Sequence, residues 1–149
     1  MADSKHSKHK DVLNQLKGLA ASGIIAQKST GIVYLDIDDD FIMKSLEVLR
    51  PLGYIKPTFL HHHIGAHIVI AEDHEMKENG GEMSHIGERV HFELVNGEIS
   101  YPEDREGGVE ALYKMRVQSG GLERLRRDLT GLETPLGGFF ILLAIRIYG

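Results

Sequence analysis

Histidines are the residues of this sequence whose type and spacing point most directly to chemistry. Five of the nine histidines fall between residues 61 and 74: His61, His62, His63, His67 and His74. His67 stands apart because it lies in the apolar run 65–70, which is typical of a buried strand with alternating side chains. An imidazole on such a strand is a candidate general acid or base, because its ordinary pKa lies close to neutrality.

The same histidines allow an alternative in which they bind a metal. Such a site would use two of the triplet 61–63 with His67 or His74 and a carboxylate, and neutral imidazoles suit zinc. The best candidates are His61, His63 and His74. However, the spacing fits no defined zinc signature, and neighbours in an extended loop point in opposite directions. We therefore favour an exposed polar loop and predict neither a metal nor another cofactor.

A second cluster, the aspartates between residues 36 and 40, also invites a metal interpretation. It lacks the glycine and the distal glutamate of a calcium-binding loop. Asp38 instead suits the start of a helix over 38–50, where carboxylates are favoured by the helix dipole. Helix capping is therefore the simpler explanation of this cluster.

Composition restricts the class of protein. The chain has 149 residues and a formal net charge of −5, so we expect one domain over 10–149 and no broad basic face for duplex DNA. Residues 1–9 resemble a flexible tail without a secretory signal. The longest apolar run, Phe139–Ile145, is far shorter than the roughly 20 residues that span a bilayer. The absence of cysteine fits the cytoplasm, or the host cytosol if the source is a virus or pathogen.

Hydrophobic periodicity predicts the elements that must position these side chains. Residues 72–87 are polar and are expected to form an exposed excursion. Asn96-Gly97 between two alternating runs predicts a hairpin over 88–101, because that dipeptide favours a tight turn. The predicted strands are 31–37, 65–71, 109–117 and 139–148, and the predicted helices are 10–21, 38–50 and 121–129.

An internal repeat links these elements. Strand, helix and strand follow one another over residues 31–71 and again over residues 109–147. When Gly65 is aligned with Gly138, His67 matches Phe140 and Val69 matches Leu142. Two such halves predict a pseudo-symmetric α+β fold with antiparallel sheets around a central cleft and helices on the outside. Lobe one would span about 24–71 and lobe two about 109–148, with the hairpin between them.

Four short motifs give the chain a resemblance to a known family. They are the start 33–39, the strand 65–68, the approach 86–88 and the closing Gly-Phe-x-Ile-x-x-Ala strand at 138–144. Over about residues 30–147 the chain resembles the 2H phosphoesterase superfamily, which has a LigT-like fold. Within it, the chain is most similar to the "Swiss army knife" RNA-repair-like group.

The resemblance implies a phosphodiesterase site and also its impairment. Family members carry a His-x-Thr/Ser motif on each central strand, and they cleave 2′,3′-cyclic phosphates or 2′–5′ linkages without a metal. One histidine acts as base and the other as acid, while the hydroxyls hold the phosphate. Here His67 remains, but Val69, Phe140 and Leu142 replace the other three motif residues. The resemblance thus implies a catalytically impaired protein.

Strand alternation predicts which side chains share the cleft. An apolar floor would carry a base stacked on Phe140, and the walls would hold a phosphate through arginine. The alternative is that the floor residues fill a collapsed cleft. The predicted floor residues are Val69, Phe140 and Leu142, and the predicted wall residues are Tyr34, His67, Arg89, His91 and Arg116.

Three functions follow from these observations. The favoured one is a domain that binds a nucleotide, an RNA end or a protein partner without turnover. A second is an active phosphodiesterase in which His67 works with a relocated partner, either His91 or one of the triplet. The third is a histidine-rich metal-binding or structural interaction module.

Overall fold

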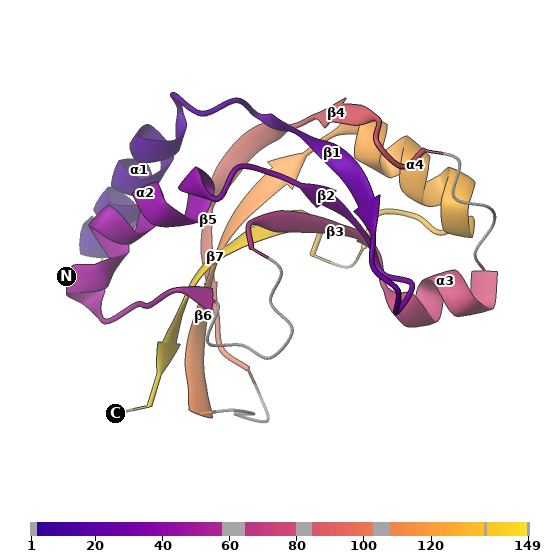
Figure 1. Cartoon of the computed structure of the whole chain (residues 1–149). Coiled ribbons are helices and arrows are strands. Elements are labelled where there is room, and N and C mark those ends of the chain that lie inside the picture. The colour runs from indigo at the N-terminus through magenta and orange to yellow at the C-terminus, as the bar shows by residue number, and fades with distance from the viewer. Residues whose placement is uncertain (1–2, 58–64, 80–84, 103–107, 136, 149) are drawn as a thin grey trace.

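The computed structural model describes residues 3–57, 65–79, 85–102, 108–135 and 137–148. The fold is α+β, and its strands form a curled antiparallel sheet in the order β4-β1-β2-β3-β7-β6-β5 (Figure 1). The strands are β1 (Ser22–Gln27), β2 (Val33–Asp36), β3 (His67–Ala71), β4 (Arg89–His91), β5 (Glu93–Ser100), β6 (Val109–Gln118) and β7 (Phe139–Ile147). The helices are α1 (Asp3–Leu16), α2 (Asp40–Leu49), α3 (Asp73–Asn79), α4 (Gly120–Thr130) and the short 3-10 helix η1 (Arg50–Leu52).

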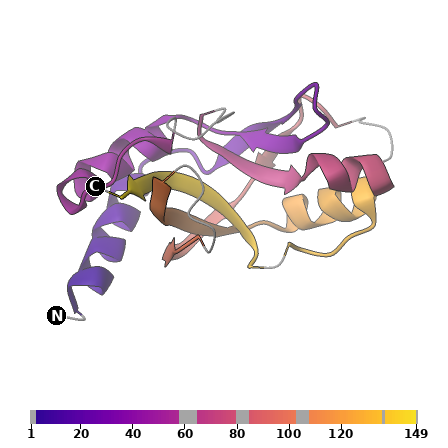
Figure 2. The same ribbon diagram turned by 90° about the horizontal axis from the view of Figure 1, so that it is seen from below.

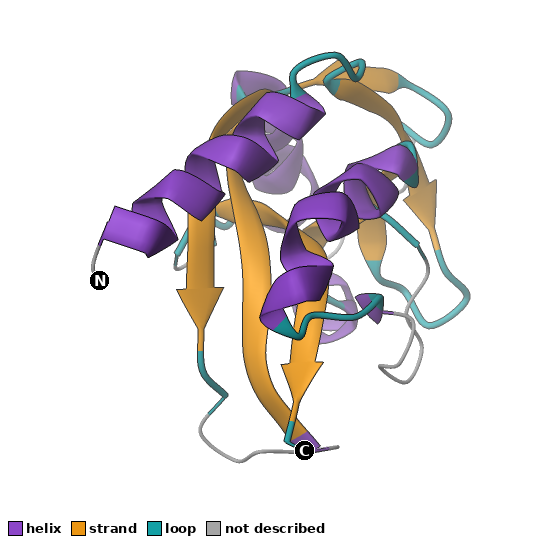
Figure 3. Cartoon of the chain, turned by 90° about the vertical axis from the view of Figure 1, so that its left-hand side faces the viewer, coloured by secondary structure: helices purple, strands orange, loops and turns teal. Residues whose placement is uncertain are grey.

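One face of the sheet is apolar and forms the core. In β6 the odd-numbered residues are buried and most of the even-numbered residues are half-buried, as strand alternation requires. Helices α1, α2 and α4 pack against this face, and Figure 3 shows α1 and α2 lying across the strands. Strand residues that are fully buried in this core include Leu35, Ile68, Ile70, Met115, Ile141 and Leu143.

The two central helices begin directly after β2 and β6. Ser119 caps α4 by accepting the Leu122 N–H, and Gly131 ends the helix in the left-handed conformation. At α2 the N-cap position belongs to Asp39, which makes no side-chain capping bond. Its carboxylate accepts the Ala66 N–H at 2.8 Å instead, and Asp38 accepts the Asp40 N–H at 2.9 Å. The aspartates thus order this turn locally, and Asp39 also ties it to the start of β3.

The two predicted repeats meet at the centre of the sheet. Ile68 in β3 pairs directly with Ile141 in β7, and these are equivalent residues in the repeat alignment. Each repeat also carries a register irregularity at the same place, opposite Ile70 in one half and opposite Leu143 in the other. An approximate twofold axis therefore passes through the Ile68–Ile141 pair. Both halves belong to one continuous sheet, whereas we predicted separate antiparallel sheets.

The predicted hairpin over 88–101 is wrong. Strand β4 pairs with β1 at one edge of the sheet, while β5 pairs with β6 at the other edge. Asn96 and Gly97 lie inside β5, at a shift of register. A Cβ atom on Gly97 would collide with the Tyr113 hydroxyl and the His9 ring. The glycine therefore permits a close approach of two side chains rather than a turn.

Local periodicity also missed helical structure in polar segments. Helix α1 begins at Asp3, so most of the predicted tail 1–9 is helical. The His9 Nδ1 atom lies 2.5 Å from the Tyr113 hydroxyl oxygen. The predicted excursion 72–87 contains helix α3. Strand β1 was not predicted. In the part of the chain that the structure describes, no helix is long and apolar enough to cross a membrane.

Candidate functional site

The face of the sheet opposite α1, α2 and α4 carries most of the predicted cleft residues. Directly paired residues of antiparallel strands project to the same side. The pairs Tyr34–Val69, Asp36–His67, Lys114–Leu142 and Arg116–Phe140 therefore share one face. Figure 2 shows β3, β7 and β6 between the helices at either side. We call this surface the site face and define it by seven half-buried residues: Tyr34, His67, Val69, Lys114, Arg116, Phe140 and Leu142.

His67 has the properties of a neutral base. Its Nδ1 atom lies 2.7 Å from the Gly65 carbonyl oxygen, which only accepts hydrogen bonds, so Nδ1 carries the proton. Burial lowers the pKa of His67 below 6.5, although the Gly65 bond and the Asp36 carboxylate act in the opposite direction. The Tyr34 ring packs edge-on, with 5.7 Å between the ring centroids. At neutral pH the ring is therefore uncharged, and its Nε2 atom is an acceptor.

Two cations lie on the other side of the twofold axis. The Lys114 Nζ atom sits 4.3 Å from the centroid of the Phe140 ring, a cation–π contact. Arg116 is the direct cross-strand neighbour of Phe140, and it approaches Glu98 at 3.5 Å in a partly exposed ion pair. Such exposed pairs contribute little free energy, so Arg116 can exchange Glu98 for another anion at little cost in stability. Lys114 is not among the site residues predicted from the sequence, although it lies two residues before Arg116 on the same strand.

Arg89 and His91 do not join His67. They lie on β4, which is separated from β3 by β1 and β2. Three strand spacings correspond to roughly 14 Å, which is too far for proton transfer through one water. Arg89 donates to the Ser22 hydroxyl at 3.0 Å. The predicted wall residues Arg89 and His91 are therefore not part of the same site as His67. The prediction failed because strand order cannot be read from local sequence.

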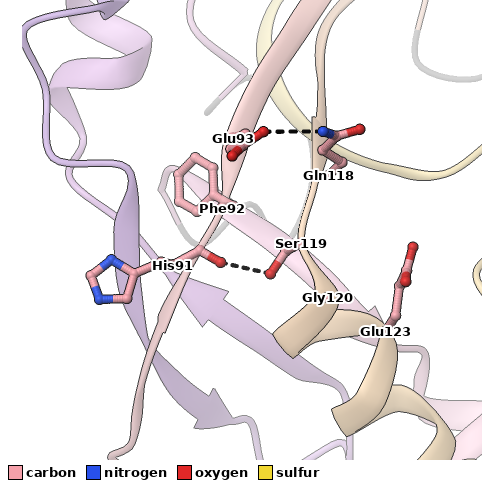
Figure 4. Close-up of a pocket in the computed structure, with 7 residues that line it drawn as sticks. All are labelled: His91, Phe92, Glu93, Gln118, Ser119, Gly120 and Glu123. Carbon is pink, nitrogen blue, oxygen red and sulfur yellow. Dashed lines mark hydrogen bonds between the residues drawn. The ribbon is translucent and has the colours of Figure 1, made fainter.

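His91 instead borders a cavity of about 430 Å³ at the start of α4 (Figure 4). Its carbonyl accepts the Ser119 hydroxyl at 2.6 Å, and Gln118 donates to the Glu93 carboxylate at 3.1 Å. Figure 4 shows the His91 ring pointing away from Glu123. The first bond joins β4 to the N-cap of α4 and the second joins β5 to β6, and neither pairs an acid with a base.

Of the three predicted metal ligands, only His74 has a described position. His61 and His63 lie outside the described residues, as does His62. His74 is exposed on α3, with its Nδ1 atom 3.9 Å from the Asp73 carboxylate. Among residues with a described position, no group of three or more histidine, aspartate or glutamate side chains could hold a metal ion.

Comparison with known proteins adds no relative. No family model, curated protein or solved structure matches this chain. The functional interpretation therefore depends on the short motifs and on the geometry of the site face.

Proposed function

We propose that this protein has a 2H phosphoesterase-like scaffold and that its site face binds a nucleotide or RNA end without cleaving it. The observation that carries the proposal is the pairing of Ile68 with Ile141. This register makes Phe140 the equivalent of His67 and Leu142 the equivalent of Val69. The alignment that puts Phe140 and Leu142 at the positions of the second motif is therefore supported by backbone geometry as well as by sequence.

Loss of turnover follows from the chemistry of the replacements. Phenyl and isobutyl groups neither donate nor accept a proton. A general acid or base contributes roughly 10²–10⁴ to a rate, so the absence of one partner removes most of the family's mechanism. The missing hydroxyls would also have held the phosphate oxygens.

Binding is supported by what the site face retains. Lys114 and Arg116 supply positive charge beside Phe140. Arginine matches phosphate geometry with paired donors, and an aromatic ring can stack on a base. The same face thus offers contacts for both the charged and the flat part of a nucleotide.

The test is a thermal-shift screen with 2′,3′-cyclic nucleotides, nucleoside monophosphates and short RNA. A ligand at 100 times its Kd should add about 2.7 kcal/mol of stability. Arg116→Gln should abolish the shift, whereas Arg124→Gln, at an exposed position on α4, should retain it. Absence of any shift with all of these phosphate compounds would contradict binding.

Chromatography of the same mixtures tests turnover. We expect the cyclic nucleotides and RNA to remain intact. Hydrolysis that disappears in His67→Ala would show that an active phosphodiesterase is the correct function, with a partner other than Phe140.

A further inference from the structure

A small cavity lies where the two central strands separate. Strands β3 and β7 pair at Ile68 and Ile141, and beyond that pair they leave a space of about 200 Å³. We call it the strand-gap cavity. Its lining includes Val69, Glu72, Arg126, Pro135, Gly138 and Phe140.

The twofold axis relates this cavity to a second place in the sheet, and backbone fills that second place. There the segment after η1 runs beside β7, and Ile55 and Ile145 exchange backbone hydrogen bonds of 2.7 and 3.0 Å. The residue equivalent to Ile145 is Glu72. Its N–H donates to the Glu75 carboxylate at 2.9 Å and not to a neighbouring strand. The cavity thus marks a difference between the two halves of the repeat.

The walls of the strand-gap cavity do not suit a phosphate. Arg126 is buried, and it already donates to the Ile70 carbonyl, the Glu133 carbonyl and both oxygens of Glu75. The charge of Arg126 is balanced by Glu75, so Glu72 leaves this end of the cavity negative. Carboxylate oxygens accept hydrogen bonds from N–H groups and repel anions. His74 also lines the cavity, and the wall formed by Val69, Pro135 and Phe140 is apolar.

The cavity adjoins the cations of the site face. Phe140 lines the cavity and also carries the Lys114 contact on its ring. A Cβ atom on Gly138 would lie 2.9 Å from Arg116 Nη2, so the guanidinium rests against the cavity rim. A molecule with a flat ring in the cavity can therefore extend its phosphate directly to Arg116 and Lys114.

We propose that the strand-gap cavity receives a planar heterocycle bearing an amino group, of the adenine type, from a ligand whose phosphate lies on Arg116 and Lys114. This inference rests on the proposed function. Whole drug-sized ligands occupy pockets of roughly 300–1,000 Å³, so a smaller cavity suits a single ring system. The amino group would donate to Glu72, and the ring would lie between Val69 and Phe140.

Calorimetry with adenosine 5′-monophosphate, inosine 5′-monophosphate, ribose 5-phosphate and inorganic phosphate separates the two proposals. We expect the adenine nucleotide to bind at least tenfold more tightly than ribose 5-phosphate and inosine monophosphate. Val69→Phe should fill the cavity and remove the advantage over ribose 5-phosphate. Ile24→Phe, a similar half-buried change on β1, should preserve it.

Glu72→Gln provides a second variant at an exposed position, where folding is not at risk. It should lose the preference for the amino-bearing base and keep its affinity for ribose 5-phosphate. The cavity assignment is wrong if phosphate compounds bind but the nucleobase adds no affinity. It is also wrong if both variants keep the wild-type preferences. If no phosphate compound binds at all, the proposed function itself fails.

Discussion

His67 is the residue whose environment most clearly sets its protonation state. The Gly65 carbonyl orients the ring, and burial opposes its positive form. A lowered pKa in the folded protein means that the unfolded chain binds a proton more readily. His67 therefore lowers the free energy of unfolding as the pH falls from 6.5 toward the lower pKa of the folded state.

We predict that NMR titration will give His67 a pKa below 6.5 and a neutral ring protonated on Nδ1. Asp36→Asn should lower this pKa further, because the Asp36 carboxylate favours the protonated ring. A His67 midpoint at or above 6.5 would mean that the ring is not desolvated.

Two neighbouring tyrosines give a second prediction at this scale. Among the described residues, the buried Tyr54 hydroxyl has no hydrogen-bond partner, whereas the Tyr113 hydroxyl contacts His9. Leaving a buried polar group unsatisfied costs roughly 1–3 kcal/mol. Tyr54→Phe should therefore leave the free energy of unfolding unchanged or raise it, while Tyr113→Phe should lower it by about 1 kcal/mol. Urea denaturation measures both, and a large loss in Tyr54→Phe would point to a hidden partner.

At the scale of elements, the buried pair of Arg126 and Glu75 joins α4 to α3 and to the end of β3. The guanidinium binds Glu75 at 2.6 Å and the Ile70 carbonyl at 2.9 Å. The hydrogen bonds from Arg126 lower the pKa of Glu75 from 4.5 to about 2. The same pair forms a wall of the strand-gap cavity, so the stability of α3 and the shape of that cavity are coupled.

This pair predicts a specific dependence of stability on pH. A lowered carboxyl pKa adds stability that is complete above pH 4.5 and is lost as the pH falls toward 2. Glu75→Gln should reduce this part of the acid sensitivity, whereas Glu78→Gln, exposed on the same helix, should not. Unfolding curves at several pH values measure the difference. Equal acid sensitivity in wild type and Glu75→Gln would show that the ion pair does not set it.

At the scale of the whole molecule, the approximate twofold axis determines how the core is built. Ile68 and Ile141 are both fully buried and face each other across the central strand pair. Strands β1 to β3 occupy one side of the axis and β5 to β7 the other. The two halves share one core, so they are expected to unfold together.

Truncation of either central isoleucine should therefore have a similar effect. Ile68→Ala and Ile141→Ala should each reduce the free energy of unfolding by about 2–5 kcal/mol, because each leaves a cavity in packed core. Ile24→Ala, at a half-buried position on the same sheet, should cost less. Denaturant unfolding with two probes would check both size and cooperativity. A near-zero effect at one isoleucine, or separate transitions for the two halves, would contradict the shared core.

The sequence by itself determined the elements whose pattern is local. Apolar alternation and helical periodicity predicted β2, β3, β6 and β7 with the helices α2 and α4, and the repeat alignment predicted which central residues are equivalent. The same alternation assigned Tyr34, His67, Val69, Arg116, Phe140 and Leu142 to one face. These features depend on which way successive side chains point, and that is fixed within a few residues.

Only the tertiary structure decided which strands become neighbours. It separated Arg89 and His91 from His67, turned the predicted hairpin into strands at opposite edges, and brought Lys114 onto the Phe140 ring. It also left the space between β3 and β7 that forms the strand-gap cavity. Strand order, register and cavities result from contacts between residues far apart in the chain, so no local pattern specifies them.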